Sequence, residues 1–152
     1  MSDGDMKQPI ELLTFKLGDQ EYALEIMSVR EIRGWTKATP MPLAPSFMRG
    51  VINLRGTVLP VIDLAERLGL PKCGQNNRNV IIVVKLEGHM TGLLVDAVSD
   101  IVALGNSDLQ DPPDAAGGNG MHVIKSLTVI DERMIRVLDL AQVVVQAESD
   151  AA

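Results

Sequence analysis

The feature that most constrains the fold of this 152-residue chain is an internal repeat. A shift of 69 positions places Lys16-Leu17 on Lys85-Leu86. The same shift aligns further apolar and acidic positions in order, namely Leu24, Ile26, Val29, Glu31 and Ile32 with Leu93, Val95, Val98, Asp100 and Ile101. Further along, a shift of 76 places Val61-Ile-Asp-Leu-Ala65 on Val137-Leu-Asp-Leu-Ala141. The two shifts differ by seven residues, which fits an insertion in the second copy within 111–120, a segment rich in Gly and Pro. The ordered set of matches indicates that the chain arose by duplication.

Each copy has the pattern of a series of short strands. Apolar runs are separated by turn signals such as Gly18-Asp19, Arg55-Gly56 and Glu87-Gly88. Among the predicted strands are 11–17, 21–26, 50–54 and 57–64 in the first copy, and 80–86, 91–95, 123–129 and 134–138 in the second. Helical turns are predicted at 65–68 and after Asp139. Three prolines exclude regular structure between Thr39 and Pro45.

About five strands in a copy of roughly 70 residues are typical of a small SH3-like barrel, because closing the sheet limits its exposed edges. We therefore predict an all-β fold with two tandem SH3-like five-stranded β-barrels packed together, with short helical turns. The two units are expected at 10–71 and 79–145 within one domain overall, and the duplication would permit an exchange of strands between them. A groove between packed barrels is a preferred place for a ligand.

Charge and composition narrow the classes of partner. The net charge is −6 and the pI is about 4.8, whereas a nucleic-acid surface needs clustered Lys and Arg. Aromatic residues make up only 3%, which leaves little material for base stacking. A small nucleic-acid-binding β-barrel is therefore a distant alternative, and protein partners are favoured. The polar first residues and the lack of an apolar run of ~20 residues predict neither a secretory signal nor membrane insertion.

Reactive side chains are few and scattered. The single cysteine, Cys73, excludes an internal disulfide and fits a reducing cytosol. His89 falls in a turn and His122 follows a Gly-rich loop, and neither has the neighbours that a metal ligand or a general base needs. Asp63 and Asp139 each precede a helical turn, where an Asp caps free N–H groups. We predict no catalytic residue, metal ligand or cofactor, so the chain is expected not to be an enzyme.

The pair Asn53 and Arg55 belongs to the first copy alone, because the second copy has Val129 and Asp131 at these positions. Alternation along a strand would place Asn53 and Arg55 on one face and Leu54 on the other. Arg55 could then offer a planar donor fork to a carboxylate or amide of a partner. An ordinary hairpin with a solvated Arg is an equally good interpretation of the spacing.

Other apolar residues of the first copy are assigned mainly to the core. Val29 is most simply a core residue, and Glu31 is most simply solvated. Trp35, at the edge of the Pro-rich segment, could anchor an interface, but a core role is favoured because aromatic residues are scarce. Met41 and Met48 flank prolines and are the methionines most suited to an exposed, adaptable protein-binding surface.

Five segments resemble the CheW family, the adaptors that couple bacterial chemoreceptors to the histidine kinase CheA. The segments are Phe15-Lys-Leu-Gly-Asp-Gln-Glu-Tyr22, Val29-Arg-Glu-Ile32, Pro45-Ser-Phe-Met-Arg-Gly-Val-Ile-Asn-Leu-Arg-Gly56, Val58-Leu-Pro-Val-Ile-Asp-Leu64 and Gly92-Leu-Leu-Val-Asp-Ala-Val-Ser-Asp100. They follow one another in the family's order over nearly the whole chain. The Asn53-Leu-Arg-Gly56 block is highly specific to the family.

The resemblance implies a scaffold without catalytic activity that assembles with the cytoplasmic tips of chemoreceptors and with the regulatory domain of CheA. It implies a receptor-facing groove that involves Val29, Glu31, Gly50, Asn53 and Arg55. The kinase contact is implied to use an apolar surface of one barrel, with no residues assigned. The implied location is the cytoplasm, with recruitment to membrane-associated receptor arrays.

One position departs from the family pattern. Family members usually carry a Gly in the second barrel where this chain reads Val123-Ile-Lys-Ser126, which affects the expected shape of that edge. The chain is too short for the kinase domains or for a fused receiver domain. An adaptor of the same family that serves surface motility or biofilm control, rather than chemotaxis, fits the sequence equally well.

Overall fold

The computed structural model describes residues 9–71, 79–113 and 123–144, and the chain in these ranges is built almost entirely of strands. The strands are β1 (Ile10–Leu17), β2 (Gln20–Glu25), β3 (Val29–Gly34), β4 (Met48–Leu54), β5 (Thr57–Asp63), β6 (Val80–Leu86), β7 (His89–Val95), β8 (Ala97–Leu104), β9 (Ile124–Ile130) and β10 (Arg133–Leu138). Short helical pieces are η1 (Ile26–Ser28), α2 (Leu64–Arg67), η2 (Asn106–Asp108) and residues 140–144. The predicted all-β class is confirmed.

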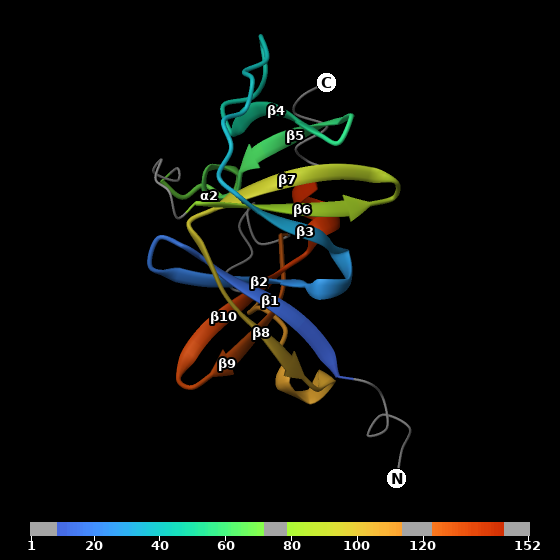
Figure 1. Cartoon of the computed structure of the whole chain (residues 1–152). Coiled ribbons are helices and arrows are strands. Elements are labelled where there is room, and N and C mark those ends of the chain that lie inside the picture. The colour runs from blue at the N-terminus through green and yellow to red at the C-terminus, as the bar shows by residue number, and fades with distance from the viewer. Residues whose placement is uncertain (1–8, 72–78, 114–122, 145–152) are drawn as a thin grey trace.

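The strands form two five-stranded sheets (Figure 1). One sheet has the order β8-β1-β2-β10-β9 and the other has the order β3-β6-β7-β5-β4. Each sheet therefore takes strands from both halves of the chain, and the sheets do not coincide with the sequence units 10–71 and 79–145. Strands β1 and β2 lie with the last three strands, while β6 and β7 lie with β3, β4 and β5.

The strand exchange is reciprocal, and its register follows the internal repeat. In the first exchange, β5 of the first half runs parallel to β7 of the second half, with Val61 opposite Gly92. In the other, β10 runs parallel to β2, with Val137 opposite Ala23. The sequence shift of 76 relates Val61 to Val137, and the shift of 69 relates Ala23 to Gly92, so the two pairs are equivalent in the repeat. The duplication is thus preserved in the pairing of the backbone as well as in residue type.

Each sheet closes into a small barrel through one isolated β-bridge. The bridge joins the strand at one edge of the sheet to the chain segment that follows the strand at the opposite edge. In the β3–β4 sheet, Thr39 pairs with Val51. In the β8–β9 sheet, Gln110 pairs with Leu127. We call these the first and second barrels. We define the seam of the first barrel as the line where β3 and residues 35–39 face β4.

Most of the buried side chains belong to one apolar cluster that runs through the first barrel and across to β1 and β2. Phe15 and Leu24 of the exchanged hairpin lie in this cluster together with Leu93 of β7. A smaller cluster fills the second barrel and consists of Leu12, Ala23, Ile135 and Val137. Burial of these side chains supplies most of the driving force for packing the two barrels together.

Both predicted helix caps are present. The Asp63 carboxylate accepts a hydrogen bond from the Glu66 backbone N–H at 3.1 Å, at the start of α2. The Asp139 carboxylate accepts from the Gln142 N–H at 3.3 Å, at the start of residues 140–144. The two helical pieces then meet, because Arg67 of α2 donates to the carbonyls of Gln142 and Val143.

Ser126 occupies the position of Gly50 in the second barrel, at the shift of 76. In the first barrel, the register of the β4–β5 pair shifts between Met48 and Gly50. In the second barrel, the register of the β9–β10 pair shifts between Val137, which lies opposite Ser126, and Leu138. Gly50 has a φ of +140°, whereas Ser126 is not among the residues with a positive φ. The second barrel therefore keeps its irregularity and its closing bridge with a backbone conformation that Ser can adopt.

Candidate functional site

The five residues that the resemblance assigns to receptor binding gather at the seam of the first barrel. Val29 and Glu31 are on β3, Gly50 and Asn53 are on β4, and Arg55 lies in the turn between β4 and β5. Strands β3 and β4 are the two opposite edges of their sheet, so only the closure of the barrel brings them together. The site thus depends on the fold of the whole barrel.

An ion pair joins the two sides of the seam. Arg55 Nη2 lies 2.6 Å from Glu31 Oε1, and Arg33 Nη1 lies 3.1 Å from Glu31 Oε2. The hydrogen bonds from Arg55 and Arg33 lower the pKa of the Glu31 carboxyl below its usual value, and the hydrogen bond to Glu31 raises the pKa of Arg55. The Arg55 side chain is still 70% exposed, so Glu31 orients a guanidinium that remains accessible to a partner.

Arg55 reaches this position through the backbone of a tight turn rather than along a strand. Arg55 and Gly56 form a two-residue hairpin loop with φ values of +53° and +89°, as a type I′ turn requires. Asn53 Oδ1 accepts the Gly56 N–H at 2.8 Å and so supports the turn. The prediction that Asn53 and Arg55 share a strand face was therefore wrong for Arg55. Leu54, which was expected on the opposite face, is buried.

Val29 and Gly50 determine the shape of the seam and contribute no polar side chain to it. Val29 is half-buried and packs against the main core at the start of β3. A Cβ atom on Gly50 would lie 2.2 Å from the carbonyl oxygen of Thr39, because the segment that closes the barrel crosses here. Of the five residues, Glu31, Asn53 and Arg55 place polar groups at the surface.

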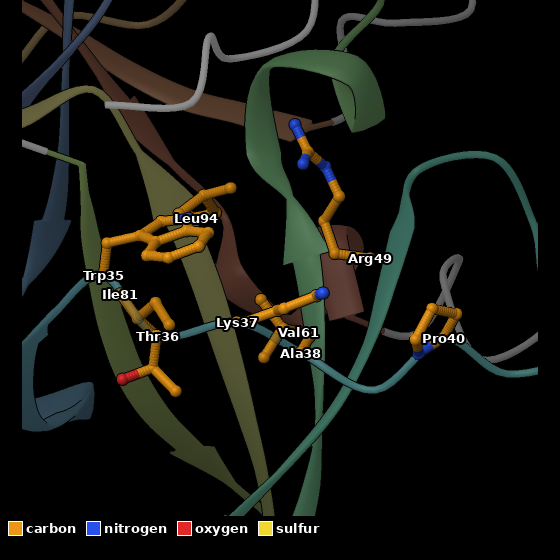
Figure 2. A pocket seen from close by; sticks show the side chains of 9 residues that line it. All are labelled: Trp35, Thr36, Lys37, Ala38, Pro40, Arg49, Val61, Ile81 and Leu94. Atoms are coloured by element: carbon orange, nitrogen blue, oxygen red, sulfur yellow. The ribbon is translucent and has the colours of Figure 1, made fainter. Parts of the chain in front are cut away.

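Two pockets lie on either side of the chain segment that closes the barrel. The seam pocket is lined by Arg33, Thr36, Lys37, Thr39, Val51, Ile52, Asn53 and Val58. The second, the mouth pocket, lies at an end of the first barrel between Trp35 and Arg49 (Figure 2), with Val61, Ile81 and Leu94 among its lining residues. Trp35 is 38% exposed there, so its prediction as a core residue was wrong. The sequence pattern predicts no role for Arg33 and Lys37.

Exposed apolar side chains occur on both barrels at equivalent positions. Ile32 and Val58 are exposed on the first barrel. At the shifts of 69 and 76, their counterparts on the second barrel are Ile101 and Met134, and both are about half exposed. Val129, the cross-strand neighbour of Met134, is also exposed. We call Ile101, Val129 and Met134 the apolar face of the second barrel.

The His, Asp and Glu side chains of the described residues are dispersed over the molecule. In residues 9–71, 79–113 and 123–144, no three His, Cys, Asp or Glu side chains gather as a metal site would require. His89 is exposed at the start of β7, and Asp63 is occupied with its helix cap and with Arg49. Cys73 and His122 lie outside the described residues.

Comparison with known proteins assigns this architecture. The family model of the CheW-like domain matches residues 11–148. The chain belongs to the CheW-like family. It is 48% identical over 142 residues to a probable chemotaxis protein CheW of Rhizobium etli, with 93% of this chain and 92% of the relative covered. It is 47% identical, with the same shares covered, to the chemotaxis protein CheW of Rhizobium meliloti.

A solved structure agrees with the CheW-like fold. The crystal structure of the scaffolding protein TtCheW from Thermoanaerobacter tengcongensis matches with a TM-score of 0.80 at 32% sequence identity. The match covers 86% of this chain and 89% of that one. The predicted membership of the family is confirmed, and with it the role of a chemotaxis adaptor that has no catalytic activity.

The CheW-like chain carries no helix suited to spanning a bilayer in the parts that the structure describes. Of the two methionines that were predicted to be exposed, one is. Met41, in the Pro-rich segment, is 47% exposed, whereas Met48 at the start of β4 is only partly exposed. Leu43, two residues after Met41, is fully exposed and has a φ of +61°, which is unusual for a bulky residue.

Proposed function

We propose that this CheW-like chain couples chemoreceptors to the histidine kinase CheA, with the receptor tip bound at the seam of the first barrel. The observation that supports this most directly is the Glu31–Arg55 pair. It holds an exposed guanidinium at a defined place, and such a group can make bidentate hydrogen bonds to a carboxylate or amide of a partner. Asn53 and Val29 lie on the same seam and extend the contact.

The kinase would bind a different surface, because an adaptor must hold both partners at once. The apolar face of the second barrel suits this role. Ile101, Val129 and Met134 are each more than half exposed, and none belongs to the seam of the first barrel. Exposed apolar side chains near the centre of an interface commonly supply much of its binding energy. The kinase's regulatory domain would cover this face.

Recruitment to receptor arrays follows from the same two contacts. The adaptor would reach the membrane through the cytoplasmic tips of the receptors and would bring the kinase with it. The acidic net charge of −6 favours protein partners over an anionic membrane surface.

The receptor contact is tested by Arg55→Glu in a binding experiment with a cytoplasmic receptor fragment. The variant should lose binding by at least about tenfold, since it removes the donor fork and places a second carboxylate beside Glu31. Its circular dichroism should be unchanged, because Arg55 is exposed. Arg30→Glu is the matched control, with the same charge change at an exposed position of β3. Equal binding by wild type and Arg55→Glu would overturn the assignment of the seam.

A further inference from the structure

The seam pocket combines cationic and apolar walls. Its cations are Arg33 at the end of β3 and Lys37 in the closing segment. Val51, Ile52 and Val58 supply the apolar wall, and the Val58 side chain is 65% exposed. A ligand that fits both walls carries a negative group at the end of an aliphatic stem.

The charge of this region is opposite to that of the chain. The seam carries three cations, Arg33, Lys37 and Arg55, and a single acid, Glu31, whereas the whole chain has a net charge of −6. Like charges gathered in one segment of an acidic protein attract a partner of the opposite sign and orient its approach. The seam is therefore suited to an acidic partner surface.

Arg33 also has a donor without a partner. Its Nη1 donates to Glu31, but its Nε–H is buried and makes no hydrogen bond within the part of the chain that the structure describes. An unsatisfied buried donor costs free energy, and an acceptor brought by a partner that repositions the guanidinium would recover it. Lys37 is exposed and lines both the mouth pocket (Figure 2) and the seam pocket, so its long side chain can bring a second charge to the same acceptor.

The duplication does not account for these cations. At the shift of 69 the counterpart of Arg33 is Val102, which packs against the core of the second barrel. The residues that correspond to the neighbourhood of Lys37 are Asn106, Ser107 and Asp108. The positive charge at these positions is therefore specific to the first barrel.

We propose that the seam pocket recognises a glutamate side chain of the chemoreceptor, with the carboxylate between Arg33 and Lys37 and the stem against Val51 and Val58. This inference rests on the proposed function and adds a recognition point beside the Glu31–Arg55 pair. It is the first barrel's charge that selects the partner, since the second barrel has no equivalent cations at these positions.

The test is the affinity of a purified cytoplasmic receptor fragment for the wild type, Arg33→Gln, Lys37→Gln and the double variant, measured by calorimetry at low and high salt. Each single change should weaken binding by about tenfold, in keeping with the loss of one charge-assisted hydrogen bond. The double variant should show a shallower salt dependence. Arg30→Gln removes the same charge from an exposed position on β3 and should bind as the wild type does.

The outcomes separate this inference from the function on which it rests. If the wild type does not bind the fragment, the proposed receptor contact fails. If the wild type binds and the double variant binds equally at both salt concentrations, the glutamate pocket is overturned while the receptor contact stands. Receptor glutamates can also be replaced by Gln one at a time. One of these replacements should weaken binding of the wild type but should not weaken binding of Lys37→Gln any further. Since Lys37 is exposed, this variant decides the matter even if Arg33→Gln folds poorly.

Discussion

The residues of the seam divide into those that shape its backbone and those that place side chains at the surface. Gly50 belongs to the first kind, because the backbone of Thr39 occupies the space where a side chain would begin. Glu31 and Arg55 belong to the second kind. The sequence could suggest Arg55 as a binding residue, but not its ion pair, since Glu31 lies 24 positions away on the other edge of the sheet.

Three glycines test how much the close approach at Gly50 matters. Gly50→Ala should lower the free energy of unfolding by about 3 kcal/mol or more, since it adds a clash with Thr39 to the strain of a positive φ. Gly56→Ala should cost about 1 kcal/mol, because its φ is +89° but its surroundings are open. Gly34→Ala meets no atom within 4 Å and should change stability by less than about 0.5 kcal/mol.

Urea unfolding of the three variants measures these differences. Equal losses at Gly50 and Gly56 would show that the closing segment can move aside, and that the barrel does not depend on its bridge at Thr39.

At the scale of elements, the two capped helical turns could be predicted from local sequence, because a cap needs only a few consecutive residues. What could not be predicted is that the caps differ in environment. Asp63 is completely buried and its carboxylate also accepts from Arg49 Nη2 at 2.9 Å. Asp139 makes its cap in a more exposed setting. The repeat preserved the residue, and the tertiary structure gave one copy a second role.

The two aspartates should therefore differ in their contribution to stability. Asp139→Ala removes a cap and should cost about 1 kcal/mol. Asp63→Ala also leaves the partly buried Arg49 without its carboxylate and should cost about 3 kcal/mol. The midpoints of thermal unfolding, corrected to free energies, provide the comparison. A cost for Asp63→Ala no greater than that for Asp139→Ala would mean that the Arg49 pair adds nothing to stability.

At the scale of the whole molecule, the sequence predicts two closely related barrels but cannot assign strands to them. The hairpins β1–β2, β4–β5, β6–β7 and β9–β10 are local and follow from their turns. The long-range choice is whether β2 pairs with β5 or with β10. Because the two copies are related, Val61 and Val137 offer nearly the same edge to either Ala23 or Gly92. The repeat therefore leaves this pairing undetermined.

Reciprocal exchange predicts that neither half of the chain folds alone. Residues 1–75 and 76–152, produced separately, should each give amide NMR spectra without dispersion, since both sheets need strands from both halves. Mixing the two fragments should restore the dispersed spectrum of the intact protein. A well-dispersed, cooperatively unfolding spectrum from 1–75 alone would contradict this account and would favour a barrel made from one contiguous unit.

We propose that this protein holds a kinase on receptors through two separate surfaces. The most direct measurement is co-sedimentation of the kinase CheA with receptor-bearing membranes, with and without this protein. We predict that the kinase enters the pellet only when the protein is present, and that Arg55→Glu removes both the variant and the kinase from the pellet. Sedimentation of the kinase to the same extent without the protein, or failure of the protein itself to sediment with the receptors, would contradict the claim.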